Sequence, residues 1–170
     1  GADNGGNSNS TPVEVKAMLL HETSEAPPVD VSIPQVIDEG EWNAGSTWES
    51  GAVPAAGFDY TTSLKLRVND AGTSFSGDSL SINSGGQLQL RDAANTFVVS
   101  NLILNGGWVY AGTGGNNTFA LDGNILVQSD ARFQSYWSSS AGPLNLNILS
   151  KISGEATITS LASSDASTHT

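Results

Sequence analysis

Short stretches of alternating apolar and polar residues recur at a nearly constant spacing along most of this chain. One column of apolar positions runs through Leu66, Leu88, Val109 and Ala131, and a second runs through Leu80, Leu102, Ile125 and Leu146. The step in both columns is about 22 residues, which lies in the range of solenoid repeats. Each stretch has one apolar face, which only stacking on a neighbouring turn can bury. The shared period predicts an all-β fold, a right-handed parallel β-solenoid of roughly five coils.

The segments between these stretches are rich in glycine and small polar residues. SINSGG, LNGG, AGTGGNN and SSSAGP have the composition of corners that need left-handed or bridging backbone conformations. An antiparallel β-sandwich is the alternative, because short strands that recur with turn signals between them are also typical of that fold. The two columns with one period favour the solenoid.

The first 38 residues lack the repeat and predict an extended segment before a solenoid domain at 39–170. GADNGGNSNS has the composition of a linker, and two short alternating stretches follow it. Prolines near these stretches favour an edge position or a linker over the centre of a sheet. We expect this segment to act as a linker or as a donor strand for assembly. The candidate assembly positions are Val13, Val15, Leu19, Leu20, Val29, Val31, Ile33, Val36 and Ile37.

Composition narrows the classes of partner. The chain has 6 Lys and Arg against 17 Asp and Glu, a formal net charge of -11. This balance argues against nucleic acid and anionic membrane surfaces, which a basic surface would bind. No apolar run approaches the roughly 20 residues of a membrane-spanning helix, so we expect no membrane insertion. Absence of cysteine excludes disulfides and thiolate chemistry, and the abundance of Gly, Ser, Thr and Asn predicts a secreted bacterial protein, extracellular or at the cell surface.

The stretch WNAGSTWESGAVPAAGFDY resembles the opening of secreted bacterial β-helix domains with autotransporter-associated β-strand repeats. NLILNGG, LDGNILV and LNLNILSKISGEATIT are similar to the repeat itself, whose isoleucine-serine-glycine step corresponds here to Ile152, Ser153 and Gly154. The resemblance covers about 42–161 and implies a fold and export, not a chemistry. It departs from the family pattern in its few coils and in its unmatched first forty residues.

Titratable residues show no catalytic pattern. The two histidines, His21 and His169, lie in the segments with the least repeat character, which predicts solvated side chains. Five aspartates adjoin predicted corners, where aspartate commonly bonds the local backbone; they are Asp70, Asp78, Asp92, Asp122 and Asp130. Calcium bound by these carboxylates is the weaker alternative, because no calcium-binding signature is present. We therefore expect no catalytic residues, no metal ligands and no cofactor.

Arginine and aromatic residues suggest surfaces instead. Arg67, Arg91 and Arg132 predict a charge-pairing edge. Exposed aligned rings bind sugars or partner surfaces, and packing over a corner is the alternative. The candidate ligand-binding aromatics are Trp108, Tyr110, Tyr136 and Trp137, whereas Trp42 and Trp48 precede the first coil and predict a cap.

These observations favour a non-enzymatic extracellular structural protein that assembles with copies of itself into a filament or surface array. Its N-terminal extension would add a strand to the open edge of a neighbour, and head-to-tail contact of this kind continues without closing. The alternative is a carbohydrate-binding or adhesive module of a larger secreted protein, with an extracellular polysaccharide as partner. A catalytic β-helix is the third hypothesis, and the sequence offers no acid–base constellation for it.

Overall fold

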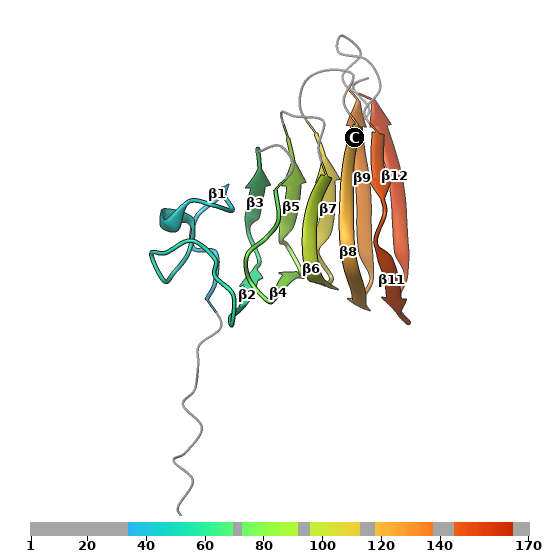
Figure 1. Ribbon diagram of the computed structural model, residues 1–170. Coiled ribbons are helices and arrows are strands. Elements are labelled where there is room, and N and C mark those ends of the chain that lie inside the picture. Colours follow the sequence, from blue (N-terminus) through green and yellow to red (C-terminus); the bar gives the residue numbers. More distant parts are fainter. Residues whose placement is uncertain (1–33, 70–72, 92–95, 113–117, 138–144, 165–170) are drawn as a thin grey trace, which may run out of the picture. The chain divides into compact units, whose positions relative to one another are not determined.

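The computed structural model describes residues 34–69, 73–91, 96–112, 118–137 and 145–164, and its architecture is a β-solenoid (Figure 1). Every ladder between two of its strands is parallel. The strands wind through about four turns, somewhat fewer than the repeat suggests. The predicted all-β solenoid is confirmed, and the antiparallel sandwich is wrong, because each strand pairs with the equivalent strand one turn away.

Each turn contributes to two sheets that face each other across the core. The first sheet contains β2 (Asp59–Thr62), β4 (Ser79–Asn83), β6 (Thr96–Asn105), β8 (Thr118–Ser129), β10 (Asn145–Ile148) and β11 (Lys151–Gly154). The second sheet contains β1 (Gly40–Glu41), β3 (Lys65–Val68), β5 (Gln87–Leu90), β7 (Trp108–Ala111), β9 (Ala131–Trp137) and β12 (Ile158–Ser164). A short 3-10 helix, η1 (Gly45–Thr47), lies between β1 and β2.

The register of the second sheet confirms three members of its predicted column and replaces the fourth. Leu66, Leu88 and Val109 are successive partners and are fully buried. Val109 then pairs with Phe133, and Ala131 pairs with Ile158 in the following turn. The turn after Val109 is longer than the predicted step, so counting forward from Val109 selects the wrong residue.

In the first sheet, the predicted spacing of about 22 residues fails one turn later. Leu80, Leu102 and Ile125 are successive partners, as predicted. Ile125 then pairs with Ile152, whereas Leu146 pairs with Phe119. Leu146 therefore belongs to a third row of apolar positions that the two predicted columns do not contain.

This third row arises because β6 and β8 are long strands with a bend. The register between them shifts after Val99, and Gly123, which pairs with Val99, has a φ of 114°. A Cβ atom on Gly123 would lie 1.9 Å from the Val99 carbonyl oxygen, so the close approach at the bend requires glycine. Before the bend, Phe97, Phe119 and Leu121 point inward and are buried, which adds a third side to the core.

The solenoid begins earlier than residue 39. The compact unit that contains it starts at Ser32. The Val36 amide donates to the carbonyl oxygen of Thr61 at 3.1 Å, and the Thr61 amide donates to Pro34 at the same distance. Residues 34–37 therefore extend the first sheet by a partial turn instead of belonging to an independent extension.

Candidate functional site

The outward side of the second sheet carries an ordered set of side chains, which we call the Trp108 face. Outward residues of an in-register parallel sheet stack in rows along the solenoid axis. One row contains Lys65, Gln87, Trp108, Arg132 and Thr159. The neighbouring row contains Arg67, Gln89, Tyr110, Gln134 and Leu161.

Trp108 and Tyr110 lie together at the middle of this face, on either side of the buried Val109. Their ring centroids are 6.0 Å apart, with an interplanar angle of 50°. The Arg132 guanidinium of the next turn lies over the Trp108 ring, 4.0 Å from its centroid. Burial raises the pKa of Tyr110 above 10.0, and the nearby positive charge of Arg91 opposes that shift. The Tyr110 hydroxyl therefore stays protonated at neutral pH.

Two glutamines lie beside these rings and are almost covered. Gln87 is 6% exposed and Gln89 is 8% exposed, although both point away from the core. They pair in register with Trp108 and Tyr110. Their side-chain carboxamides form no hydrogen bond with other residues of the described ranges, although each can donate and accept. The sequence alternation placed Trp108 and Tyr110 outward, but it gave no reason to single out the glutamines.

A groove of about 540 Å³ adjoins Trp108 at the corner where the second sheet begins. Its wall includes Trp108, Asp130 and Arg132, and its other lining residues are Gly85, Gly106, Gly107, Ala131, Thr159 and Leu161. Gly85 and Gly106 have φ values of 85° and 83°, which these corners require and which leave the backbone bare. The groove thus follows the solenoid axis over several turns.

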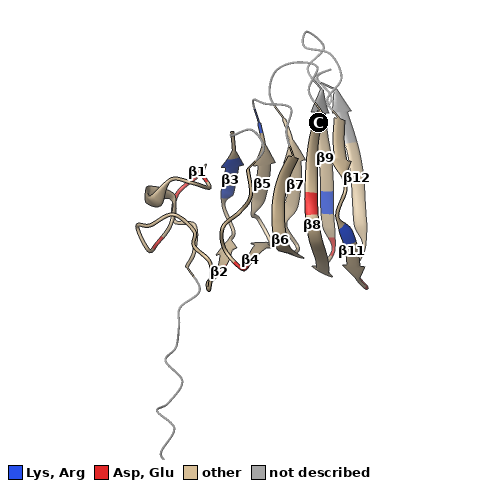
Figure 2. Ribbon diagram, in the orientation of Figure 1, with Lys and Arg blue, Asp and Glu red and all other residues tan. Residues whose placement is uncertain are grey.

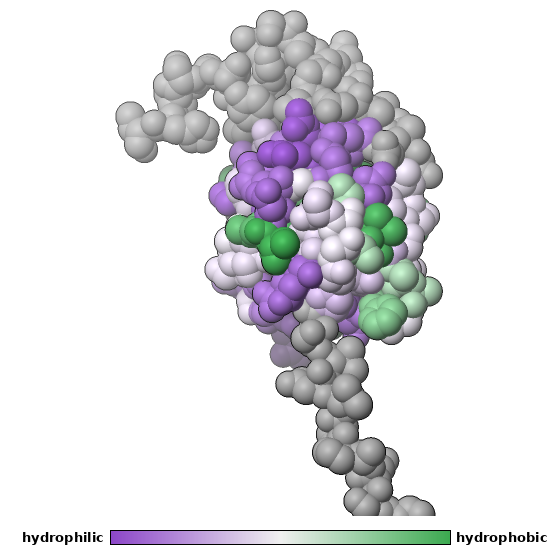
Figure 3. Space-filling view, turned by 90° about the vertical axis from the view of Figure 1, so that its left-hand side faces the viewer, coloured by the Kyte–Doolittle hydropathy of each residue, from purple (hydrophilic) through white to green (hydrophobic). Residues whose placement is uncertain are grey.

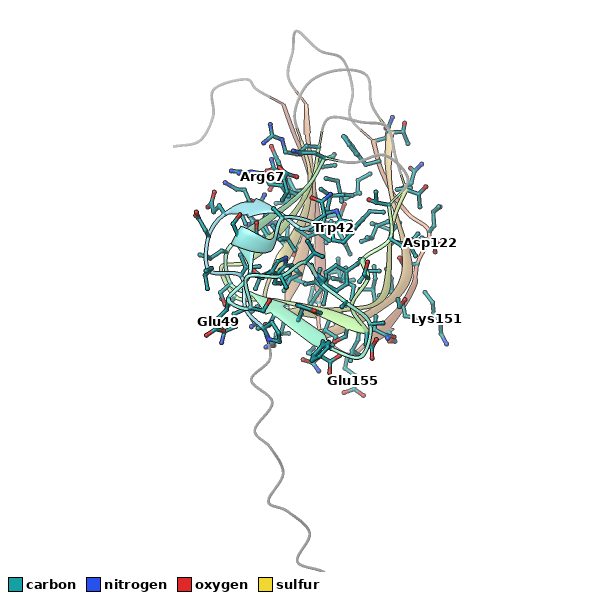
Figure 4. All side chains as sticks on the ribbon, turned by 60° about the vertical axis from the view of Figure 1, so that its left-hand side comes forward. Trp42, Glu49, Arg67, Asp122, Lys151 and Glu155 are labelled. Atoms are coloured by element: carbon teal, nitrogen blue, oxygen red, sulfur yellow. The ribbon has the colours of Figure 1, made fainter. Side chains whose placement is uncertain are left out.

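Positive charge gathers on this side of the solenoid. Lys65 and Arg67 lie on β3, Arg91 directly follows β5, and Arg132 lies on β9 (Figure 2). Within the described residues the ion pairs are those of Glu39 with Lys65 at 3.1 Å and with Arg67 at 3.3 Å. The remaining described cation is Lys151 on β11, and it lies on the opposite side of the coil from Arg67 (Figure 4).

A second groove of about 540 Å³ lies on the outward side of the first sheet. Its polar side chains other than Lys151 already bond to their neighbours. The Asn101 carboxamide donates to the Asp78 carbonyl oxygen at 2.9 Å, and that of Asn124 donates to Ser100 at 3.0 Å. This groove differs from the Trp108 face because its amides stabilise the bend of the strands.

At the N-terminal end of the solenoid the edge of the first sheet is covered, whereas β1 forms the outer edge of the second sheet. Residues 47–49 run antiparallel to residues 35–37: the Glu49 amide donates to Gln35 at 2.8 Å, and the Ile37 amide donates to Thr47 at 3.0 Å. Trp48, in the middle of this segment, and Trp42 are buried, and their rings contact those of Tyr60, Phe75 and Phe97. Seen from this end, the surface is mainly hydrophilic, with separate hydrophobic patches (Figure 3). Trp42 points into the coil (Figure 4).

The C-terminal end is different, and we call β10, β11 and β12 the open turn. Their outer edges pair with no other described strand. Leu146, Ile148 and Ile158 face the core but are only partly buried, and Leu149 and Ile152 are 59% and 45% exposed. A cavity of about 280 Å³ has Phe133, Leu146, Ile148, Ile152 and Ile158 among its lining residues.

Several residues or side chains singled out from the sequence lie outside the described part of the chain. Tyr136 and Trp137 are on β9, but their side chains are outside the described part. So are His21, His169, Asp70, Asp92 and the assembly positions from Val13 to Ile33. Val36 is buried in the partial first turn and Ile37 is exposed, so Val36 is already used within its own chain. Phe133, which lies on the same strand as Tyr136 and Trp137, is in the core.

The described aspartates behave as corner residues. Asp78 accepts a hydrogen bond from the Gly57 amide at 2.8 Å, and Asp130 accepts one from Thr157 at 2.9 Å. Asp122 accepts from the adjacent Gly123 amide. No group of three or more His, Cys, Asp or Glu side chains that could hold a metal ion occurs within the described ranges.

The part of the chain that the structure describes contains no helix long and apolar enough to cross a membrane. Comparison of the chain with protein-family models, with curated proteins and with solved structures gives no match.

Proposed function

We propose that this chain is a non-enzymatic extracellular structural module that assembles with copies of itself through its open turn. The observation that carries the proposal is the difference between the two ends of the solenoid. At one end an antiparallel segment covers the edge of the first sheet and the core is buried, whereas the other end presents the strand edges of both sheets over a partly exposed core.

Closure of the first-sheet edge at the N-terminal end supports an assembly in which that end and the open turn play different roles. The backbone groups of residues 35–37 bond to β2 on one side and to residues 47–49 on the other, so no strand can be added there. The described segment 34–64 also contains five acidic residues and no basic ones, which opposes contact between two such ends.

The open turn has the properties of an acceptor. Its backbone edges offer hydrogen bonds to an added strand, and its exposed leucine and isoleucine side chains gain about 25 cal/mol for each Å² that an added strand removes from water. The cavity beside Phe133 can receive apolar side chains of that strand.

The occupant that we propose is the N-terminal segment of a second copy. Val29, Val31 and Ile33 alternate with polar residues, as do Val13 and Val15, and such segments add to a sheet edge through the backbone while alternate side chains set the register. The donor and acceptor surfaces differ, so each copy can bind one neighbour and be bound by another, which produces an open filament. The extracellular location rests on composition alone.

The test uses the full chain and two substitutions that place a charge in the contact. Val31→Asp alters the donor and Ile152→Lys alters the acceptor, and Ser24→Asp and Val53→Lys are the matched controls outside the contact. Sedimentation velocity and negative-stain electron microscopy should show oligomers or filaments for the parent and both controls, and monomers for Val31→Asp and Ile152→Lys. Circular dichroism checks that all variants keep the β fold.

A parent chain that stays monomeric at high concentration would overturn the proposal. Assembly that survives Val31→Asp but not Ile152→Lys would retain the open turn and reject the donor segment. Assembly that survives both would reject the open turn as well.

A further inference from the structure

We propose that the Trp108 face binds an acidic polysaccharide, with Arg132 receiving a sugar carboxylate and the adjacent groove holding the chain. The groove shares Thr159 and Leu161 of β12 with the open turn, but the binding that we propose does not depend on self-assembly.

Charge supplies the first argument. The whole chain has a net charge of -11, yet four of the five Lys and Arg residues in the described ranges lie on the second sheet or directly after one of its strands. Lys65 and Arg67 share Glu39, whereas Arg132 forms no ion pair with a described carboxylate. The Arg132 guanidinium is therefore not held in an ion pair with a described carboxylate, although Asp130 lines the same groove.

Packing makes Arg132 suited to that role. Its guanidinium is held over the Trp108 ring at 4.0 Å, so little side-chain freedom is lost when a ligand binds. A planar guanidinium forms two parallel hydrogen bonds with a carboxylate, which fixes orientation as well as supplying affinity. The ring beneath it is then a support for the arginine, and not the open stacking platform that the sequence suggested.

Groups beside Arg132 can bind the hydroxyl and C–H groups of a sugar. The Gln87 and Gln89 carboxamides, almost buried and without a partner in the described part of the chain, can exchange hydrogen bonds with hydroxyl groups. Trp108 and Tyr110 are only partly buried, so their rings keep apolar surface for the C–H groups of a sugar ring. The groove at the glycine corners extends across turns that are about 4.8 Å apart, so it suits an extended chain lying along the axis.

A polysaccharide fits these features better than a nucleic acid does. Nucleic acids bind through several phosphate contacts, which require many unpaired cations. The Trp108 face combines one such arginine with two glutamines, two aromatic rings and a bare groove. A polymer whose sugars each carry one carboxylate and several hydroxyl groups matches this combination of one arginine with several uncharged groups.

Affinity electrophoresis of the full chain provides the test, with polygalacturonate as the acidic probe and its methyl ester as the matched neutral probe. We expect retardation by polygalacturonate and little by the ester. Arg132→Gln should weaken binding about tenfold, which is typical for loss of a charged hydrogen bond, and Arg132→Lys should restore part of it. Trp108→Ala should also weaken binding, because it removes the support of the arginine.

Lys151→Gln is the control, since it removes the same charge from the other side of the coil. It should leave the retardation unchanged. Three results would each overturn the proposal. The first is equal retardation by the ester, and the second is equal weakening by Lys151→Gln. The third is that neither polygalacturonate nor a second uronate polymer, alginate, binds. Far-UV circular dichroism of every variant separates lost binding from lost folding.

Discussion

The indole nitrogen of Trp48 donates a hydrogen bond to the backbone carbonyl oxygen of Trp42 across 2.8 Å. The indole nitrogen of Trp42 is buried as well, but it has no hydrogen-bond partner within the described residues. The two tryptophans of the N-terminal end therefore differ in what their N–H groups contribute.

The first prediction uses that difference. Trp48→Phe leaves the buried Trp42 carbonyl without its donor, which costs about 1–3 kcal/mol in addition to the smaller side chain. Trp42→Phe loses similar volume but removes an unpaired buried donor, so its effect on the free energy of unfolding should be smaller by about 1–2 kcal/mol. Urea unfolding followed by circular dichroism measures both, and an equal or larger loss for Trp42→Phe would contradict this account.

The second prediction concerns the bend in β8. Gly123→Ala should destabilise the protein by about 3 kcal/mol or more, because it combines an unfavourable positive φ with a collision against the Val99 carbonyl oxygen. Gly51 also has a positive φ but no atom within 4 Å of an added Cβ, so Gly51→Ala should cost only about 1–2 kcal/mol. Urea midpoints compare the two variants, and similar losses would indicate that the bend can relax.

The third prediction tests a polar ladder at the corner between the sheets. The Asn105 carboxamide donates to that of Asn83 at 3.3 Å, and the Asn83 carboxamide donates to the Thr61 hydroxyl at 2.8 Å. Asn83→Ala and Asn105→Ala should be coupled by about 0.5–1 kcal/mol in a double-mutant cycle of unfolding free energies. A cycle of Asn83→Ala with Asn145→Ala, on the distant strand β10, should show no coupling; an additive first cycle would mean that the ladder contributes nothing.

The fourth prediction follows from the raised pKa of Tyr110. Because the folded-state pKa is above the unfolded value of 10.0, the folded protein retains the phenolic proton longer than the unfolded chain does. The resulting contribution to stability is fully present below about pH 10 and is lost as the pH rises through the folded-state pKa. Tyr110→Phe should therefore flatten the alkaline decline in unfolding free energy, which urea titrations at several pH values measure. An unchanged decline would show that other groups cause it.

Much of the fold follows from local pattern. Leu66, Leu88 and Val109 pair as their spacing predicts, because these turns have nearly constant length. The later turns lengthen, so the same count selected Ala131 and Leu146 where the structure has Phe133 and Ile152. Phe97 and Leu121 form a third apolar row, which can be recognised in the sequence once the bend is known. The residues around the bend do not by themselves distinguish it from a corner between two strands.

The binding face was predictable only in part. Alternation around Val109 placed Trp108 and Tyr110 outward, because neighbouring residues of a strand point to opposite faces. It could not reveal that Arg132 covers the Trp108 ring, since that contact depends on the lengthened turn that pairs Val109 with Phe133.

The sequence by itself determined the solenoid, since a repeated apolar column has few other ways to be buried. Only the tertiary structure decided the register of the last turns, the closure of one end and the exposure of the other. The physical reason is that alternation and period fix which side of a strand is buried, whereas the length of each corner fixes which residues from different turns meet.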